Sequence, residues 1–289
     1  MKLGENTLKA VCSYFKKELK NTYDESELNQ ILQISFLHFF GWSRADIILN
    51  QENIISEENN KIVINLVAKL KTNKPLAQII GEWEFYGLKF KVNEHTLIPR
   101  PETEELVQLI IEENKNVENC NILDIGTGTG CIPISLKSEL KNVNLTAFDI
   151  SEEALEIAKK NSKLNRLDVE FRQLDILNFE AELMPGGFDV IVSNPPYIPN
   201  KEKELMHKNV LDYEPGLALF VDNTEPLIFY DKISDFALSY LKSTGKLYFE
   251  INENYGEATK QLLIDKGFKN VNIVKDMNEK DRIVYCTLN

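Results

Sequence analysis

The spacing of apolar and polar residues differs between two parts of the 289-residue chain. Before residue 75, apolar side chains recur three and four residues apart, which is the spacing of one face of a helix. The clearest such run is Leu28, Ile31, Leu32, Phe36 and Phe39. Polar residues that can cap a first helical turn precede helical segments here, namely Asp24, Ser43 and Ser56. We therefore expect residues 1–74 to form a small helical bundle, a separate domain that docks a substrate.

An alternating pattern replaces the helical spacing after Pro75. Apolar and polar side chains alternate over residues 82–85 and 88–92, as they do in a strand with one buried face. Tyr86 and Gly87 lie between the two segments and suit a tight turn. The pattern predicts a β-hairpin, which we place in a linker of residues 75–100.

Residues 101–289 alternate between short apolar runs and longer helical patterns. Unbroken apolar runs are typical of strands that are buried on both faces of a parallel sheet. Strands that alternate with helices predict an α/β domain with a doubly wound, mostly parallel, seven-stranded sheet. The expected strands lie at residues 121–125, 144–148, 168–175, 188–192, 246–251, 271–274 and 283–287. The polar stretch 201–211 has neither pattern and is predicted to be a mobile flap.

The charge of the chain is unevenly distributed. The formal net charge is −12, from 33 Lys+Arg and 45 Asp+Glu. Residues 1–74 contain 10 basic and 9 acidic residues, and the remainder contains 23 and 36, which gives net charges of +1 and −13. No basic stripe is visible, so we expect no stable binding of nucleic acid.

Membrane and disulfide-rich classes are also disfavoured. No stretch approaches the ~18 uninterrupted apolar residues of a membrane span, and the first residues lack the apolar core of a signal peptide. The cysteines show no paired spacing, so we expect neither a metal site nor a disulfide framework. They are Cys12, Cys120, Cys131 and Cys286. We expect a cytoplasmic protein that does not act at a membrane and is a monomer.

The strongest chemical signal directly follows the predicted strand at 188–192. Asn194, Pro195, Pro196 and Tyr197 come next, and the two prolines can continue neither a strand nor a helix. Asn194 is therefore held on a stiff ledge at the carboxyl end of a strand, where open α/β sheets bind ligands. An isolated Asn-Pro dipeptide usually marks only a turn, but the full sequence after a buried strand is far more specific.

This ledge suits a planar NH2 group, which offers two donors and no charge. The Asn194 side chain and the backbone carbonyl of Pro195 provide neutral acceptors, and the Tyr197 ring can stack on a flat group. Pro196 keeps the ledge rigid. Asn194, Pro195 and Tyr197 are the candidate catalytic residues, and with Pro196 they form the candidate substrate site.

A second candidate site follows the predicted strand at 121–125. It is a glycine-rich turn that lets a ligand approach the backbone closely, and it consists of Gly126, Thr127, Gly128, Thr129 and Gly130. Its spacing is not that of a dinucleotide or phosphate loop.

Further candidate residues end the next two predicted strands. Asp149 ends one of them, where a carboxylate can bind both hydroxyls of a ribose. Asp175 and Ile176 follow another and suit an adenine, whose amine and face they would contact. With the glycine turn and Asn194 they form the candidate cofactor site.

Together these stretches resemble the HemK-type release-factor glutamine methyltransferases. The resemblance spans nearly the whole chain from Pro75, and the helical segment has the size of that family's amino-terminal domain. The matching segments are 75–81, 97–104, 124–130, 194–199, 214–215, 218–219 and 250–251.

The resemblance implies a reaction as well as a fold. Members of this family use S-adenosyl-L-methionine to methylate the side-chain amide nitrogen of the glutamine in the Gly-Gly-Gln loop of peptide-chain release factors. It implies a Rossmann-like methyltransferase domain at residues 101–289, with release factors as protein partners. By position in the family, Arg100 and Glu102 are expected near the cofactor cleft.

Three alternative functions stay open. A ribosomal-protein glutamine methyltransferase would have the same catalytic domain. A methyltransferase of adenine amines in DNA or RNA would share the ledge, but the net charge of −13 beyond residue 74 argues against it. A nonenzymatic binding module would not need the glycine turn, Asp149 and Asn194 together.

Overall fold

A computed structural model describes residues 6–179 and 187–289. Contacts between Cα atoms divide the chain into two compact units. The first unit contains Met1–Gly81 and His207–Tyr213, and the second contains Glu82–Met206 and Glu214–Asn289. The predicted division at residues 74 and 100 differs from these bounds, because the β-hairpin belongs to the second unit.

The first unit is a helical bundle around its own apolar core, which includes Phe15, Phe36 and Leu70. All three expected caps accept hydrogen bonds from backbone N–H groups at the starts of α2, α3 and α4, namely Asp24, Ser43 and Ser56. The helices are α1 (Leu8–Leu19), α2 (Glu25–Phe40), α3 (Arg44–Leu49), α4 (Glu57–Leu70), α5 (Leu76–Ile80) and α9 (Lys208–Leu211). The sequence therefore predicted the bundle correctly from short-range patterns.

The polar stretch that was predicted to be a flap is folded into short helices. It forms η2 (Asn200–Leu205) and α9, and its last part joins the helical unit. The Tyr213 hydroxyl donates to the Thr72 carbonyl at 2.9 Å, and the Tyr213 carbonyl accepts from the Gln78 amide at 2.7 Å. These bonds to distant residues give the stretch an order that its own composition does not indicate.

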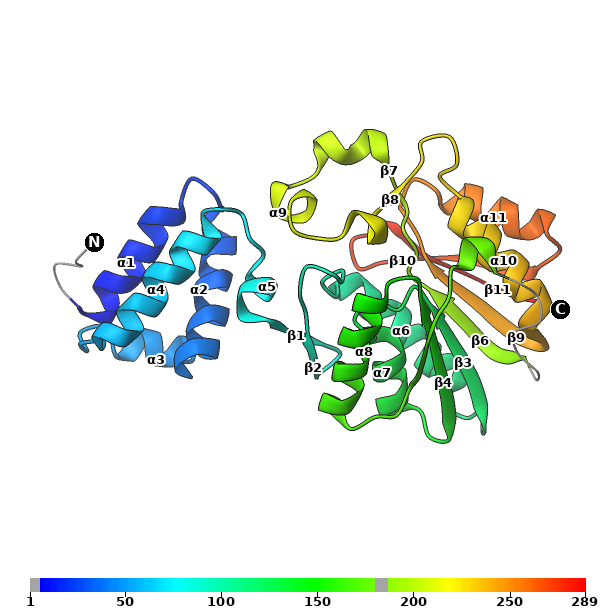
Figure 1. Cartoon of the computed structure of the whole chain (residues 1–289), viewed down its shortest axis with the longest axis horizontal. Coiled ribbons are helices and arrows are strands. Elements are labelled where there is room, and N and C mark those ends of the chain that lie inside the picture. The colour runs from blue at the N-terminus through cyan, green and yellow to red at the C-terminus, as the bar shows by residue number, and fades with distance from the viewer. Residues whose placement is uncertain (1–5, 180–186) are drawn as a thin grey trace. The chain divides into compact units, whose positions relative to one another are not determined.

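The second unit contains the predicted seven-stranded sheet (Figure 1). The strand order is β10-β11-β9-β6-β3-β4-β5, and β11 runs antiparallel to both of its neighbours. The strands are β3 (Cys120–Ile125), β4 (Val143–Asp149), β5 (Glu170–Gln173), β6 (Phe188–Ser193), β9 (Leu241–Glu250), β10 (Lys269–Lys275) and β11 (Asp281–Thr287). This order confirms a doubly wound, mostly parallel sheet. Two predicted strands have different bounds in the structure, since β9 begins at Leu241 rather than at residue 246 and β5 is shorter than the predicted 168–175.

Helices cover both faces of this sheet (Figure 1). Neighbouring residues of β3 point to opposite faces, since Ile122 packs in the core with α6 and α7 and Leu123 packs in the core with α10 and α11. The helices are α6 (Pro101–Asn114), α7 (Cys131–Glu139), α8 (Glu152–Asn165), α10 (Ile228–Tyr240) and α11 (Gly256–Asp265). Burial of β3 on both faces explains its unbroken apolar sequence.

Smaller elements complete the unit. The predicted hairpin is present as β1 (Glu82–Phe85) and β2 (Leu88–Lys91), with Tyr86 and Gly87 at positive φ in the turn. The short pieces near the site are η1 (Ile176–Asn178), η3 (Gly216–Ala218), β7 (Ile198–Pro199) and β8 (Phe220–Val221). Over the described part of the chain, none of the helices has both the length and the apolar character needed to cross a membrane.

The strand order reverses between β3 and β6. The chain proceeds outward from β3 to β4 and β5, then returns to β6 on the other side of β3. At this switch point the two crossover connections diverge, and a crevice opens beyond the carboxyl ends of the strands. The Ser193 hydroxyl donates to the Ile125 carbonyl at 2.6 Å and ties the two strand ends together.

Candidate active site

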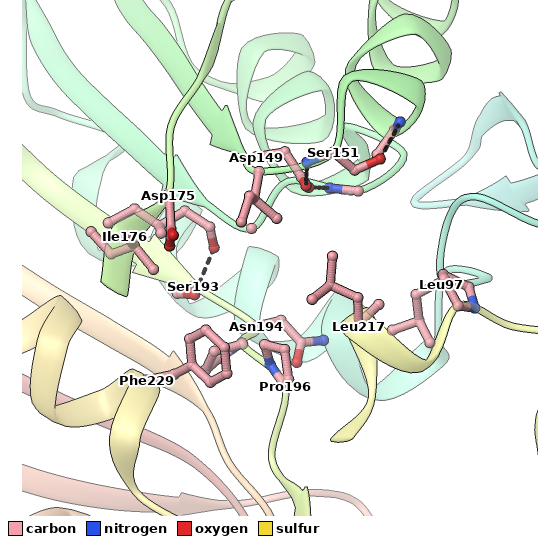
Figure 2. A pocket seen from close by; sticks show the side chains of 18 of the residues that line it. Leu97, Asp149, Ser151, Asp175, Ile176, Ser193, Asn194, Pro196, Leu217 and Phe229 are labelled. Atoms are coloured by element: carbon pink, nitrogen blue, oxygen red, sulfur yellow. Dashed lines mark hydrogen bonds between the residues drawn. The ribbon is translucent and has the colours of Figure 1, made fainter. Parts of the chain in front are cut away.

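A cavity of about 240 Å³ lies at the carboxyl ends of β3, β4 and β6. Figure 2 shows Asp149, at the end of β4, across the cavity from Asn194, which follows β6. The glycine turn, Asp149, the Asp175–Ile176 pair and the Asn194 ledge all contribute lining residues. The structure therefore brings together the four separate candidate segments.

The glycine turn has an open side toward the cavity at Gly126 and Gly128. These two residues have φ of +77° and +54°, and a Cβ built on either would meet nothing within 4 Å. Both line the cavity. The turn thus leaves bare backbone exposed to a ligand in conformations that L side chains rarely adopt.

The third glycine has a different role from the first two. A Cβ on Gly130 would lie 3.1 Å from Ile134 Cδ1 and 3.2 Å from Ala158 Cβ. Gly130 therefore permits close packing of α7 against α8. Gly130, Thr127 and Thr129 are not among the residues that line the cavity, unlike the sequence-based assignment of the whole turn.

Asp149 is held rigidly by backbone donors. Its Oδ2 accepts from the Gly128 N–H at 2.8 Å, and its Oδ1 accepts from the Ser151 N–H at 3.0 Å. Burial raises the pKa of this carboxyl, and the N–H donors, the one of Ser151 first, oppose the rise. The carboxylate thus has fixed acceptors at the edge of the cavity and also shapes the glycine turn.

The end of the cavity beyond β5 is largely apolar. Ile150, Ile176 and Leu177 line it. Asp175 accepts from the Leu177 N–H at 2.9 Å and from the Asn178 amide at 2.7 Å, which orients its carboxylate. A flat apolar slot with one acceptor at its rim suits a purine that carries an amine.

The ledge after β6 is built as the sequence predicted. Asn194, Pro195 and Pro196 line the cavity, and the Asn194 carboxamide points toward Leu217 (Figure 2). Its Nδ2 donates to the Thr103 hydroxyl at 3.2 Å. Among the described residues, none donates a hydrogen bond to Asn194 Oδ1. That oxygen is therefore an available neutral acceptor.

The Tyr197 ring is not placed to stack on a substrate in the cavity. It is not among the residues that line the cavity, and its ring packs against the apolar core beside α10. Its hydroxyl donates to Glu250 Oε1 at 3.3 Å. Burial, followed by the charge of Glu250, raises the pKa of Tyr197 far above its usual range. Tyr197 therefore holds the ledge in place from the core side, outside the cavity.

Two segments that the sequence did not assign close the cavity. His95, Thr96 and Leu97 come before α6, and Pro215, Leu217 and Ala218 come with η3. Leu217 keeps 60% of its surface exposed and Phe229 adds an aromatic side chain from α10. The Glu-Pro-Gly-Leu-Ala-Leu motif could have indicated Leu217, but no local signal singled out Phe229.

A buried ion pair joins these two segments. The Glu214 carboxylate accepts from the Ile98 N–H at 2.9 Å and from the Arg100 guanidinium. The Glu214 side chain is 1% exposed. Arg100 therefore supports the wall of the cavity without lining it, and Glu102 lines a separate surface hollow with Glu104.

Asp124 is a further carboxyl that sequence reasoning passed over. It precedes the glycine turn and is fully buried, and neither of its oxygens accepts a well-formed hydrogen bond from the residues that the structure describes. Burial raises its pKa to about 7, the nearby Thr127 hydroxyl opposes the rise, and the Asp149 charge adds to it. In the described part of the chain, no cluster of His, Cys, Asp and Glu has the arrangement of a metal site.

These features fit S-adenosylmethionine. The open backbone at Gly126 and Gly128 would face its charged amino-acid end, and Asp149 would accept from the ribose hydroxyls. The apolar slot at Ile150, Ile176 and Leu177 would hold the adenine. Each part of the cofactor thus finds a surface of matching chemistry in one cavity.

Two family models match the chain. One is described as the Methyltransferase small domain and covers residues 102–212. The other is described as the PrmC N-terminal domain and covers residues 10–81. The first match covers the first part of the sheet-containing region, and the second covers most of the helical region.

Known relatives match the chain over nearly its full length. The Release factor glutamine methyltransferase of Flavobacterium psychrophilum is 44% identical over 93% of this chain and 95% of the relative, and that of Bacteroides thetaiotaomicron is 40% identical over 95% and 98%. A solved Methyltransferase from Pyrococcus furiosus shares the fold, with a TM-score of 0.53 and 21% identity over 78% of this chain and 98% of that one. The chain belongs to the family of release factor glutamine methyltransferases.

Proposed function

We propose that this protein methylates the side-chain amide nitrogen of the glutamine in the Gly-Gly-Gln loop of peptide-chain release factors, in the cytoplasm. It is an S-adenosyl-L-methionine-dependent protein-glutamine N-methyltransferase. The observation that carries the choice of substrate group is the neutral ledge, where Asn194 Nδ2 donates to Thr103 and Asn194 Oδ1 accepts no hydrogen bond from the described residues. An amide NH2 offers such an acceptor a donor without bringing a charge.

The ledge compensates for the poor nucleophilicity of an amide. The lone pair of an amide nitrogen is delocalised into its carbonyl group. Asn194 Oδ1 and the Pro195 carbonyl are proposed to accept the two N–H groups of the substrate amide, which increases electron density on nitrogen. Because both acceptors are fixed by the rigid Pro-Pro segment, they also orient the nitrogen toward the cofactor end of the cavity.

When bound, S-adenosylmethionine would supply an electrophilic methyl group on a sulfonium. The residues that would hold it are the Gly126–Gly128 backbone, Asp149 and the apolar slot at Ile176. Leu97 and Leu217 would cover the cavity and limit the access of water. The contribution of the chain is mainly orientation and neutral electrostatics.

Replacement of Asn194 tests this role directly. Asn194→Ala removes the acceptor, and Asn194→Asp keeps acceptors but removes the NH2 donor and adds a charge. A negative charge at this position stabilises the ground state, in which the positive charge of the sulfonium is concentrated, more than the transition state, in which that charge is dispersing. Catalysis requires the opposite preference. Both variants should lose about 10²–10³-fold in single-turnover methyl transfer at saturating cofactor and release factor. The exposed Asn272→Ala is the matched control and should keep the parental rate.

The choice of substrate is tested by offering different acceptors. The full-length protein is incubated with labelled S-adenosylmethionine and, separately, with release factor, with ribosomal protein and with DNA. Label on the Gly-Gly-Gln glutamine supports the proposal. Label on ribosomal protein or on adenine amines instead would identify one of the alternative activities and reject this one.

A further inference from the structure

A chain of hydrogen bonds runs behind Asn194, outside the cavity. The Asn194 Nδ2 donates to Thr103 Oγ1 at 3.2 Å, and Thr103 Oγ1 donates to Glu250 Oε2 at 2.6 Å. The Tyr197 hydroxyl donates to the other carboxylate oxygen, Glu250 Oε1, at 3.3 Å. Thr103 and Glu250 are 3% and 1% exposed, and neither lines the cavity. One buried carboxylate is thus connected to both ends of the ledge.

The chemistry of these groups dictates the direction of each bond. An ionised carboxylate only accepts, so the single hydroxyl proton of Thr103 is committed to Glu250. The Thr103 oxygen can then only accept from its remaining neighbour. The Asn194 carboxamide must therefore present Nδ2 to Thr103, and its Oδ1 is left for the cavity. Without this constraint the two ends of a carboxamide have nearly the same shape.

We infer that Thr103 and Glu250 are positioning residues, which set the orientation of the Asn194 carboxamide so that its oxygen rather than its NH2 receives the substrate amide. This inference rests on the proposed function, in which that oxygen accepts an amide N–H. If the Asn194 carboxamide were flipped, its NH2 group would face the N–H groups of the substrate amide, and neither could accept a hydrogen bond from the other. Thr103, in the first turn of α6, and Glu250, at the end of β9, act only through Asn194 and Tyr197.

The hydroxyl groups and the cation around Glu250 partly oppose the effect of burial on its pKa. Burial raises the pKa of Glu250, and the Thr103 hydroxyl, the Arg282 charge and the Tyr197 hydroxyl lower it, while the Glu102 charge raises it further. The Tyr230 hydroxyl donates a hydrogen bond to the backbone carbonyl of Glu250 at 3.3 Å. Arg282 is itself paired with the buried Asp276 at 3.1 Å. One cation and two hydroxyl donors therefore face this carboxylate.

The first test observes the Asn194 amide without any reaction. In the full-length protein labelled with 15N-asparagine, the Asn194 side-chain NH2 signals are identified by their absence in Asn194→Asp. Thr103→Val removes the hydroxyl but keeps the shape of the side chain, and it should shift and broaden these signals. Thr103→Ser retains the hydroxyl and should leave them near their parental positions. Unchanged signals in Thr103→Val would overturn the inference.

A matched control separates positioning from a general loss of packing. Thr259 on α11 is also fully buried, and within residues 6–179 and 187–289 its hydroxyl has no hydrogen-bond partner. Thr259→Val therefore makes the same chemical change outside the hydrogen-bonded chain. It should alter neither the Asn194 signals nor the rate of methyl transfer.

The second test measures single-turnover methyl transfer. Thr103→Val should be about 10- to 100-fold slower than the parent, with unchanged affinity for S-adenosylmethionine, and Thr103→Ser should recover most of the rate. In an Asn194→Ala background, Thr103→Val should have little further effect, because its influence passes through Asn194. Equal rates for Thr103→Val and Thr259→Val, or a full additional loss in the Asn194→Ala background, would reject the inference.

The two tests fail in different ways. If the parent methylates no release factor, the proposed function fails, but the Asn194 signals still report whether Thr103 orients the carboxamide. If the parent is active and those signals do not respond to Thr103→Val, only the positioning inference fails.

Discussion

Asp149 and Gly128 are joined by a hydrogen bond of 2.8 Å from the Gly128 N–H to Asp149 Oδ2. The carboxylate at the end of β4 thereby fixes the glycine turn that follows β3. One residue thus has two effects on the cavity, since it places carboxylate acceptors at the edge of the cavity, where they would bind a ribose in the proposed cofactor site, and it shapes the backbone beside them.

Replacement of Asp149 should weaken cofactor binding by at least tenfold. Asp149→Ala removes charge-assisted bonds of ~1.5–3 kcal/mol each, and ~1.4 kcal/mol corresponds to tenfold in affinity. Calorimetric titration with S-adenosylmethionine measures the effect, and thermal melting verifies the fold. Asp265→Asn, on the exposed end of α11, is the control and should bind as the parent does. Unchanged affinity in folded Asp149→Ala would contradict the ribose assignment.

The first and third glycines of the turn should respond differently to alanine. Both substitutions impose about 1–2 kcal/mol of left-handed backbone strain. Gly130→Ala also forces a methyl group against Ile134 and Ala158, which adds about 1–3 kcal/mol of overpacking. We expect Gly130→Ala to lower the free energy of unfolding more, and Gly126→Ala to reduce cofactor affinity more. Urea unfolding and calorimetry distinguish them, and identical behaviour of the two variants would contradict their assigned roles.

Loss of Glu214 should destabilise the wall of the cavity. Glu214→Ala leaves the Ile98 N–H and the Arg100 guanidinium without their carboxylate, and an unpaired buried donor costs about 1–3 kcal/mol. Glu170→Ala breaks an exposed Arg–Glu pair with Arg172 and is the matched control. It should change stability much less, because exposed ion pairs contribute little. Similar urea midpoints for the two variants would argue against a structural role for the buried pair.

Asp124 should make stability depend on pH. Burial raises its pKa from an ordinary 3.8 to about 7, so between these values unfolding releases a proton and the free energy of unfolding falls as pH rises. A shift of about 3 pKa units sets an upper limit of about 4 kcal/mol. Asp124→Asn should therefore gain stability relative to the parent between pH 5 and pH 8.

Denaturant unfolding at several pH values, without added cofactor, measures this effect. Asp149 and Glu250 also have raised pKa values, so part of the slope should remain in Asp124→Asn. Asp265→Asn should keep the whole parental slope. If Asp124→Asn kept it as well, Asp124 would not be the group that takes up the proton.

Much of the fold could be predicted because it depends on neighbours in the sequence. The helix starts at Asp24 and Ser56 follow from side chains that reach their own first turn. The hairpin at Tyr86-Gly87 and the ledge at Pro195-Pro196 depend on the backbone preferences of the residues themselves. Gly126, Asp149 and Asn194 could be placed together because parallel strands end at one edge of the sheet.

The remaining features depended on contacts between distant parts of the chain. Thr103 and Glu250 are separated by 147 residues, and Ile98 and Glu214 by 116. Tyr197 could equally have faced the cavity, and only its packing beside α10 and its bond to Glu250 turned it away. Sequence alone thus determined the chemistry available at the sheet edge. Tertiary packing decided which of those groups line the cavity and which hold the others in place, because burial and hydrogen-bond partners are properties of the assembled core.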